Sequence, residues 1–153
     1  IKETLLAIYP STKGFGYVFF EEPNQLIDFG NAIATPFTNE RILMRIDSML
    51  DFYNPDVVIA PKNSNCKRVN ELLKQIKAKA QRNNKAFFEY SREDIQLLFS
   101  EFGIKSKYDI AKELARVFPE LQNRVPPKRT LGDPDDYIIP VFDALSLVMV
   151  YKR

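Results

Sequence analysis

Histidine is absent from this 153-residue sequence, and cysteine occurs once, at Cys66. Without histidine, a Ser-His-Asp or Cys-His catalytic arrangement is excluded, and so is a zinc site of the usual Cys/His type. One cysteine forms no internal disulfide and suits a reducing compartment. Any metal ion would therefore have to be a hard cation held by oxygen atoms.

Long apolar runs are also missing. No segment approaches the roughly 20 apolar residues that a membrane-spanning helix needs, and the first residues lack the layout of a signal peptide. We therefore expect a cytoplasmic protein that has no membrane as a partner. A chain of this length has room for one domain with a sizeable core, so we expect residues 1–153 to form a single domain.

Charge is unevenly distributed along the chain, although the net charge is only +2. Residues 1–61 carry 4 basic and 8 acidic side chains, whereas residues 62–92 carry 9 basic and 2 acidic ones. A basic block of this kind neutralises phosphate groups. It is equally typical of a solvated helix face, and the sequence leaves both interpretations open.

Apolar patterning predicts the elements of an α/β fold. Strands are expected at residues 3–9, 15–22, 26–29, 56–60 and 86–90. Helices are expected from Thr38 to Asn54, over residues 64–85 with Asn63 or Ser64 as the cap, and after Ser91 and Ser106. An extended connector over residues 119–136 then leads to a nearly all-apolar helix that begins near Pro140. This order predicts a five-stranded mixed sheet with helices on both faces: the first three strands antiparallel, the fourth and fifth parallel to the first.

The first strand and the turn after it carry a motif. Ile8 and Pro10 end the strand, and Gly16 and Tyr17 follow at a fixed spacing. This arrangement resembles the RuvC branch of the ribonuclease H-like superfamily, the Holliday-junction resolvases. In that family the strand ends in Ile-Asp-Pro-Gly, and Gly-Tyr follows seven residues after the Asp. Here Tyr9 stands at the position of that aspartate.

Two further family positions are matched in part. The final helix of the family carries Asp-Ala-x-Asp-Ala-Leu, and Asp143 with the two residues after it matches the second half. Pro140 stands at the position of the first aspartate of that motif. The family's fourth strand ends in a glutamate, whereas the stretch from Ala60 to Lys62 contains no acid. The resemblance therefore implies a ribonuclease H-like fold in which Asp143 is the one retained catalytic acid.

Loss of acids bears directly on chemistry. Two-metal phosphodiester cleavage needs several carboxylates around two cations about 4 Å apart. Tyr9 is neutral at pH 7 and too bulky to share that space, and Lys62 would add a positive charge near it. We therefore expect no resident metal ion or other cofactor, and a degenerate site at the former positions Tyr9, Ala60, Lys62 and Pro140.

Structural roles compete with these assignments. An acid such as Asp143 stabilises a helix N-terminus, and Tyr9 suits a core or pocket-lining aromatic. Lys62 and Asn63 either hydrogen-bond phosphate or merely cap the following helix. Three further acids lie before the last helix, namely Asp133, Asp135 and Asp136. Together with Asp143 they would form a shifted carboxylate cluster. Without Asp143 they would form a solvated turn.

The leading hypothesis is a RuvC-like protein that binds nucleic acid and has lost metal-dependent nuclease activity. The expected phosphate contacts are Lys62, Lys67, Arg68, Lys74 and Lys77. One alternative is an active endonuclease or resolvase that uses Mg²⁺ or Mn²⁺ with Asp143 and rearranged acids. Another is a non-catalytic protein-interaction module. Members of the family often dimerise, so the resemblance also allows a homodimer.

Overall fold

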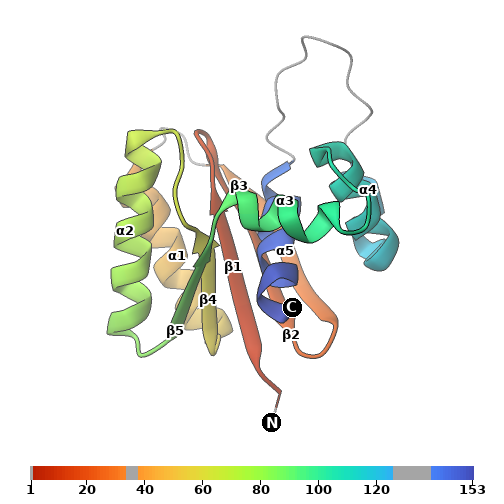
Figure 1. Cartoon of the computed structure of the whole chain (residues 1–153). Coiled ribbons are helices and arrows are strands. Elements are labelled where there is room, and N and C mark those ends of the chain that lie inside the picture. Colours follow the sequence, from red (N-terminus) through yellow and green to blue (C-terminus); the bar gives the residue numbers. More distant parts are fainter. Residues whose placement is uncertain (1, 34–37, 126–138) are drawn as a thin grey trace.

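The sheet forms the centre of the fold (Figure 1). The computed structural model describes residues 2–33, 38–125 and 139–153. Its strands are β1 (Thr4–Pro10), β2 (Gly14–Glu21), β3 (Gln25–Ile33), β4 (Val57–Pro61) and β5 (Ala86–Tyr90), in the order β3-β2-β1-β4-β5. The first three strands pair antiparallel, β4 pairs parallel with β1, and β5 pairs parallel with β4. The predicted five-stranded mixed sheet is confirmed.

Helices cover both faces of the sheet, as predicted. Helices α1 (Asn39–Tyr53) and α2 (Lys67–Arg82) lie on one face. Helix α5 (Ile139–Lys152) lies on the other, with α3 (Arg92–Ser100) and α4 (Lys107–Val117) packed beside it. Side chains of a strand alternate between the faces: Leu5 and Ala7 join the core under α5, while Leu6 and Ile8 join the core under α1 and α2. Burial on both faces explains why the first strand is an unbroken apolar run.

Helix α5 is buried on most sides, which its apolar sequence predicts. Its fully buried residues include Val141, Ala144, Leu145, Leu147 and Val148. Within the described ranges, no helix has both the length and the apolarity to cross a membrane.

Gly16 fixes where α5 begins. A Cβ atom on this residue of β2 would stand 2.2 Å from the carbonyl carbon of Pro140 and 2.5 Å from the nitrogen of Val141. Real Cβ atoms never approach backbone so closely, so only glycine allows α5 to rest directly on the strand. The Gly16 of the sequence motif is therefore a packing requirement of the fold.

Three of the predicted helix caps are confirmed, because the hydroxyls of Thr38, Ser91 and Ser106 accept backbone N–H bonds from the third residue of their helices. The cap predicted for α2 is wrong. That helix begins at Lys67, with Cys66 at the cap position and no capping bond from its side chain.

A local interaction explains the later start of α2. The Asn70 side chain accepts a hydrogen bond from the Ser64 backbone N–H at 2.7 Å and donates to the Ser64 carbonyl at 2.9 Å. This pair of bonds holds Ser64 outside the helix.

Two other boundaries differ from the predictions. Strand β3 continues to Ile33 instead of ending at Phe29, because the backbone from Gly30 to Ile33 pairs with residues 14–17 of β2. The predicted extended connector begins with a 3₁₀ helix, η1 (Pro119–Arg124), anchored by the fully buried Leu121. A proline is favoured in the first turn of a helix. The part of the connector from residue 126 to 136 lies outside the described residues.

Candidate functional site

A cavity of about 530 Å³ opens where β1 and β4 end. These two parallel strands present their carboxyl ends to the same edge of the sheet, the usual place for a ligand site in an open α/β sheet. Its lining includes residues from the strand ends, from the segment before α2, and from the first turns of α3, α4 and α5: Tyr9, Pro10, Ser11, Thr12, Lys13, Pro61, Asn63, Ser64, Asn65, Val69, Arg92, Glu93, Lys107, Pro140 and Asp143.

Arg92 and Asp143 form an ion pair in this cavity. The Arg92 Nη2 atom donates to the Asp143 Oδ1 atom at 3.2 Å. The Asp143 side chain is only 10% exposed and that of Arg92 is 26% exposed, so the pair is partly shielded from water. A charge-assisted hydrogen bond of this kind is stronger than a neutral one.

Tyr9 completes the group. The Arg92 guanidinium carbon lies 5.7 Å from the centroid of the Tyr9 ring, within reach of a cation–π interaction. Burial raises the pKa of the Tyr9 hydroxyl, and the Asp143 carboxylate raises it further, while Arg92 opposes the change. Tyr9 is therefore neutral at any physiological pH, and the charges of the group belong to Arg92 and Asp143.

The structure brings together some of the predicted site positions and separates others. Tyr9, Pro140 and Asp143 all line the cavity. Ala60 is fully buried in the core under α1 and α2, on the opposite face of the sheet. Pro61, one residue on, is the part of β4 that lines the cavity, because successive residues of a strand face opposite ways.

Lys62 does not line the cavity. Its side chain is exposed, and its backbone N–H donates to the Tyr90 carbonyl at 2.9 Å. The positive charge expected from Lys62 near the site is supplied by Arg92 instead. Arg92 belongs to the basic block of residues 62–92, but no role is predicted for it from the sequence. The signal was available, since the capping pair of Ser91 and Asp94 makes Arg92 the first residue of a helix that follows a parallel strand.

The described residues do not fit a two-metal site. Among them, no three His, Cys, Asp or Glu side chains are grouped to hold a metal ion. Glu93 and Asp143 are the carboxylates of the cavity lining, and Asp143 is paired with a guanidinium. The other acids proposed for a shifted cluster, at positions 133, 135 and 136, lie outside the described residues, so that cluster stays a prediction.

Five of the six basic residues of α2 fall into two groups. At about 100° per residue, Lys67, Lys74 and Lys77 fall within about 80° of one another, and all three are exposed. Glu71 is exposed on the same side and interrupts this face once. We call Lys67, Lys74 and Lys77 the open basic face.

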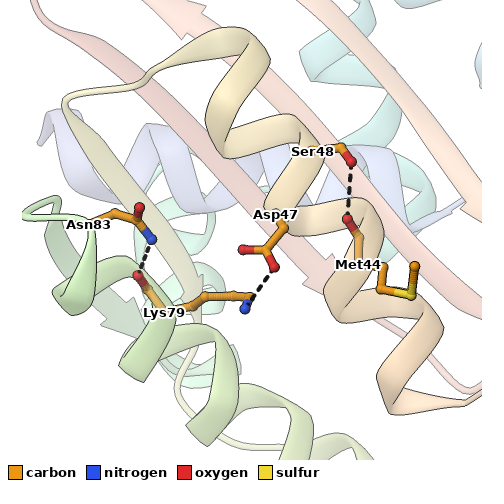
Figure 2. A network of polar contacts seen from close by, with 5 residues as sticks. All are labelled: Met44, Asp47, Ser48, Lys79 and Asn83. Carbon is orange, nitrogen blue, oxygen red and sulfur yellow. Dashed lines mark hydrogen bonds and ion pairs between the residues drawn. The ribbon is translucent and has the colours of Figure 1, made fainter.

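The flank of α2 that faces α1 is less available to a ligand. Lys79 pairs with Asp47 of α1 at 2.7 Å, and Figure 2 shows the two side chains pointing toward one another. The Arg68 Nη2 atom donates to the Thr12 carbonyl at 3.1 Å. Arg68 therefore ties α2 to the turn between β1 and β2, although its side chain is exposed.

This arrangement is that of the RuvC-like ribonuclease H fold, and comparison with solved structures bears it out. A structure of Thermus thermophilus RuvC in complex with a Holliday junction substrate matches with a TM-score of 0.67 over 97% of this chain and 91% of that chain, at 13% identity. Another structure of Thermus thermophilus RuvC matches with a TM-score of 0.63 over 96% of this chain and 92% of that chain, at 15% identity. The fowlpox virus Holliday junction resolvase matches with a TM-score of 0.54 over 97% of this chain and 96% of that chain, at 16% identity. Identities this low establish the fold alone.

No protein-family model matches the sequence, and no curated protein matches it. The likeness to known proteins is therefore a likeness of fold.

Proposed function

We propose that this protein binds nucleic acid through a RuvC-like fold and does not cut it by metal-dependent hydrolysis. The observation that carries the proposal is the Arg92–Asp143 ion pair in the cavity at the ends of β1 and β4. The guanidinium stands beside the retained acid, where a nuclease of this fold would need cations held by several carboxylates.

Arg92 reproduces only part of what a metal ion does. Its positive charge attracts phosphate oxygens. A guanidinium remains protonated at all relevant pH values, so it takes no proton from a water molecule. Binding is thereby supported while hydrolysis lacks an activated nucleophile.

The open basic face supports nucleic acid as the partner. From Lys67 to Lys77 the helix rises about 15 Å, and its N-terminal end lies beside the cavity, to which Asn65 and Val69 contribute. A strand lying along these lysines would therefore lead into the cavity. Two of the similar structures, those of Thermus thermophilus RuvC and fowlpox virus resolvase, were solved with Holliday junction DNA, which favours the same class of ligand here.

Fluorescence anisotropy with branched and linear DNA and RNA tests this proposal. We expect binding at low salt that weakens steeply as salt rises, with a slope in log K against log salt of about −0.9 for each phosphate neutralised. Replacing Lys67, Lys74 and Lys77 by alanine should weaken binding and flatten that slope by up to about 3.

A second triple variant controls for net charge. Lys2, Lys105 and Lys112 are exposed and lie away from α2, so their replacement by alanine should leave affinity nearly unchanged. Undetectable binding at low salt, or equal losses in the two triple variants, would contradict the proposal and favour a protein-interaction module.

An active endonuclease is the second candidate, and the observation that favours it is the presence of both Glu93 and Asp143 in the cavity lining. Incubation of the same substrates with Mg²⁺ or Mn²⁺ separates the two. Cleavage that is abolished by Asp143→Asn would establish this candidate and overturn the proposed loss of cutting.

A further inference from the structure

The cationic side chains of the cavity at the ends of β1 and β4 are already engaged. Arg92 pairs with Asp143 and also hydrogen-bonds the Tyr9 hydroxyl. Lys13 and Lys107, which line the same cavity, each interact with another group. A ligand that enters the cavity therefore meets chiefly the neutral groups of its lining.

The neutral lining combines apolar surface with amides. Pro10, Pro61 and Val69 are buried and contribute the apolar part. Asn63 and Asn65 are exposed and contribute amides, each with two N–H donors and a carbonyl acceptor. A flat ring with polar atoms on its rim matches both kinds of surface. The volume of about 530 Å³ lies within the range of roughly 300–1,000 Å³ that small-molecule pockets occupy, so a purine base with its sugar fits.

The segment between β4 and α2 holds the two amides in place. Asn70 clamps Ser64 from inside α2, because it accepts from the Ser64 N–H at 2.7 Å and donates to the Ser64 carbonyl at 2.9 Å. The Ser64 hydroxyl accepts from the Cys66 backbone N–H at 3.1 Å. The segment is also fixed at its start, where the Lys62 N–H donates to the Tyr90 carbonyl. The backbone is thus ordered before a ligand arrives, which lowers the entropic cost of binding.

Glu93 favours a base over a phosphate at this place. It is exposed in the same lining, and its negative charge repels a phosphate but accepts a hydrogen bond from an exocyclic amino group. The carboxamide of an asparagine pairs with adenine through the amino group and a neighbouring ring nitrogen. Thymine presents carbonyl oxygen where adenine presents its amino group, so the lining favours adenine.

We propose that the cavity receives one unpaired nucleobase of a nucleic acid strand, with Asn63 and Asn65 as hydrogen-bond partners of its edge and Asn70 as their positioning residue. A base inside a duplex has its edge paired and its faces stacked, so it enters only at the cost of unpairing and unstacking. The open basic face holds the phosphates of the same strand. This inference rests on the proposed function and deepens it by naming the part of the nucleic acid that the cavity takes.

Short abasic DNA strands that are alike in their phosphates test this assignment. One strand carries a central adenine, another a central thymine and a third no base. Each is titrated into the whole chain at low salt, and the side-chain amide signals of Asn63 and Asn65 are followed by ¹H–¹⁵N NMR. The adenine strand should shift both signals saturably and bind about tenfold more tightly than the strand without a base. The thymine strand should fall between them, and a fully paired duplex should leave both signals unmoved.

Adenosine separates the base from the phosphates. It is uncharged, so it should shift the same two signals with a weak affinity that does not change with salt, whereas every strand should bind less tightly as salt rises. Strands that bind equally well with and without a base would refute this inference and leave the proposed function standing. Saturable shifts with adenosine, but no binding of any strand or duplex, would refute the proposed function alone.

Variants locate the groups that recognise the base. Asn63→Ala and Asn65→Ala should each reduce the preference for the adenine strand and leave the affinity for the strand without a base unchanged. Asn70→Ala should reduce the same preference although both amides are still present, because the segment that carries them is no longer clamped. Asn70→Asp keeps the acceptor for the Ser64 N–H and loses the donor, so it should be intermediate. A merely structural role of Asn70 would lower stability and leave the preference intact.

Asn83→Ala is the matched control. Asn83 lies at the other end of α2, where its side chain donates to the Lys79 carbonyl at 2.7 Å (Figure 2). This variant should bind every probe like the parent. An undiminished preference for adenine in the double variant Asn63→Ala/Asn65→Ala would overturn the assignment. So would a paired duplex that shifts the two amide signals as strongly as the adenine strand does.

Discussion

Removing Arg92 without removing Asp143 should destabilise the fold. The carboxylate is nine-tenths shielded, and it accepts a charge-assisted hydrogen bond from the guanidinium at 3.2 Å. Breaking a buried ion pair on one side costs about 3–5 kcal/mol. Because about a quarter of the Arg92 side chain is exposed, water screens part of that cost, and we expect Arg92→Gln to lower the free energy of unfolding by ~2–3 kcal/mol.

Urea unfolding of the two single variants and the double variant measures this effect. In Arg92→Gln/Asp143→Asn both charges are gone and a neutral amide pair replaces them, so the double variant should recover much of the loss, with a coupling energy of ~1–2 kcal/mol. The exposed pair of Arg116 and Glu113 is the control, and Arg116→Gln should cost less than ~1 kcal/mol. If Arg92→Gln costs no more than that control, or if the double variant recovers nothing, the ion pair does not hold the cavity together.

Three smaller perturbations are equally direct. Gly16→Ala should cost ~1–3 kcal/mol in urea unfolding, because the new Cβ meets the backbone of Pro140; an unchanged midpoint would contradict the contact. Although the neutral thiol of Cys66 makes no capping hydrogen bond, the backbone N–H groups of Val69 and Arg68 favour its thiolate form and lower its pKa, so iodoacetamide should alkylate the folded chain faster than the urea-unfolded chain at neutral pH. Asp47→Asn should change stability by less than ~1 kcal/mol, since the Asp47 side chain in its pair with Lys79 is 47% exposed to water.

The elements of the fold were predictable wherever local chemistry determines them. Three helix starts were predicted correctly, because a hydroxyl at the cap position accepts a hydrogen bond from one of the first backbone N–H groups. The capping residues are Thr38, Ser91 and Ser106. The start of α2 was not predictable in this way, because Ser64 is held by Asn70, a residue six positions further along inside the helix. The end of β3 depended on its pairing with the neighbouring strand β2.

The site was predictable in place but not in composition. The motif around Tyr9 and the last helix located the edge of the sheet where the cavity lies. Successive residues of β4 face opposite sides of the sheet, so a shift of one residue in the alignment exchanges Pro61, which faces the cavity, for Ala60, which does not. The role of Arg92 follows from a contact between residues 51 positions apart, which no local pattern specifies.

The contact between Gly16 and the start of α5 also bears on how this site could be redesigned. Backbone meets backbone there, so the start of the helix that carries Asp143 does not depend on the side chains of the cavity. The frame and the cavity side chains are to that extent separable, and an engineer exchanging Tyr9 or Pro61 for acids would change the chemistry while keeping the scaffold. For the same reason, the cavity side chains could be exchanged one at a time during evolution while the backbone frame stays folded.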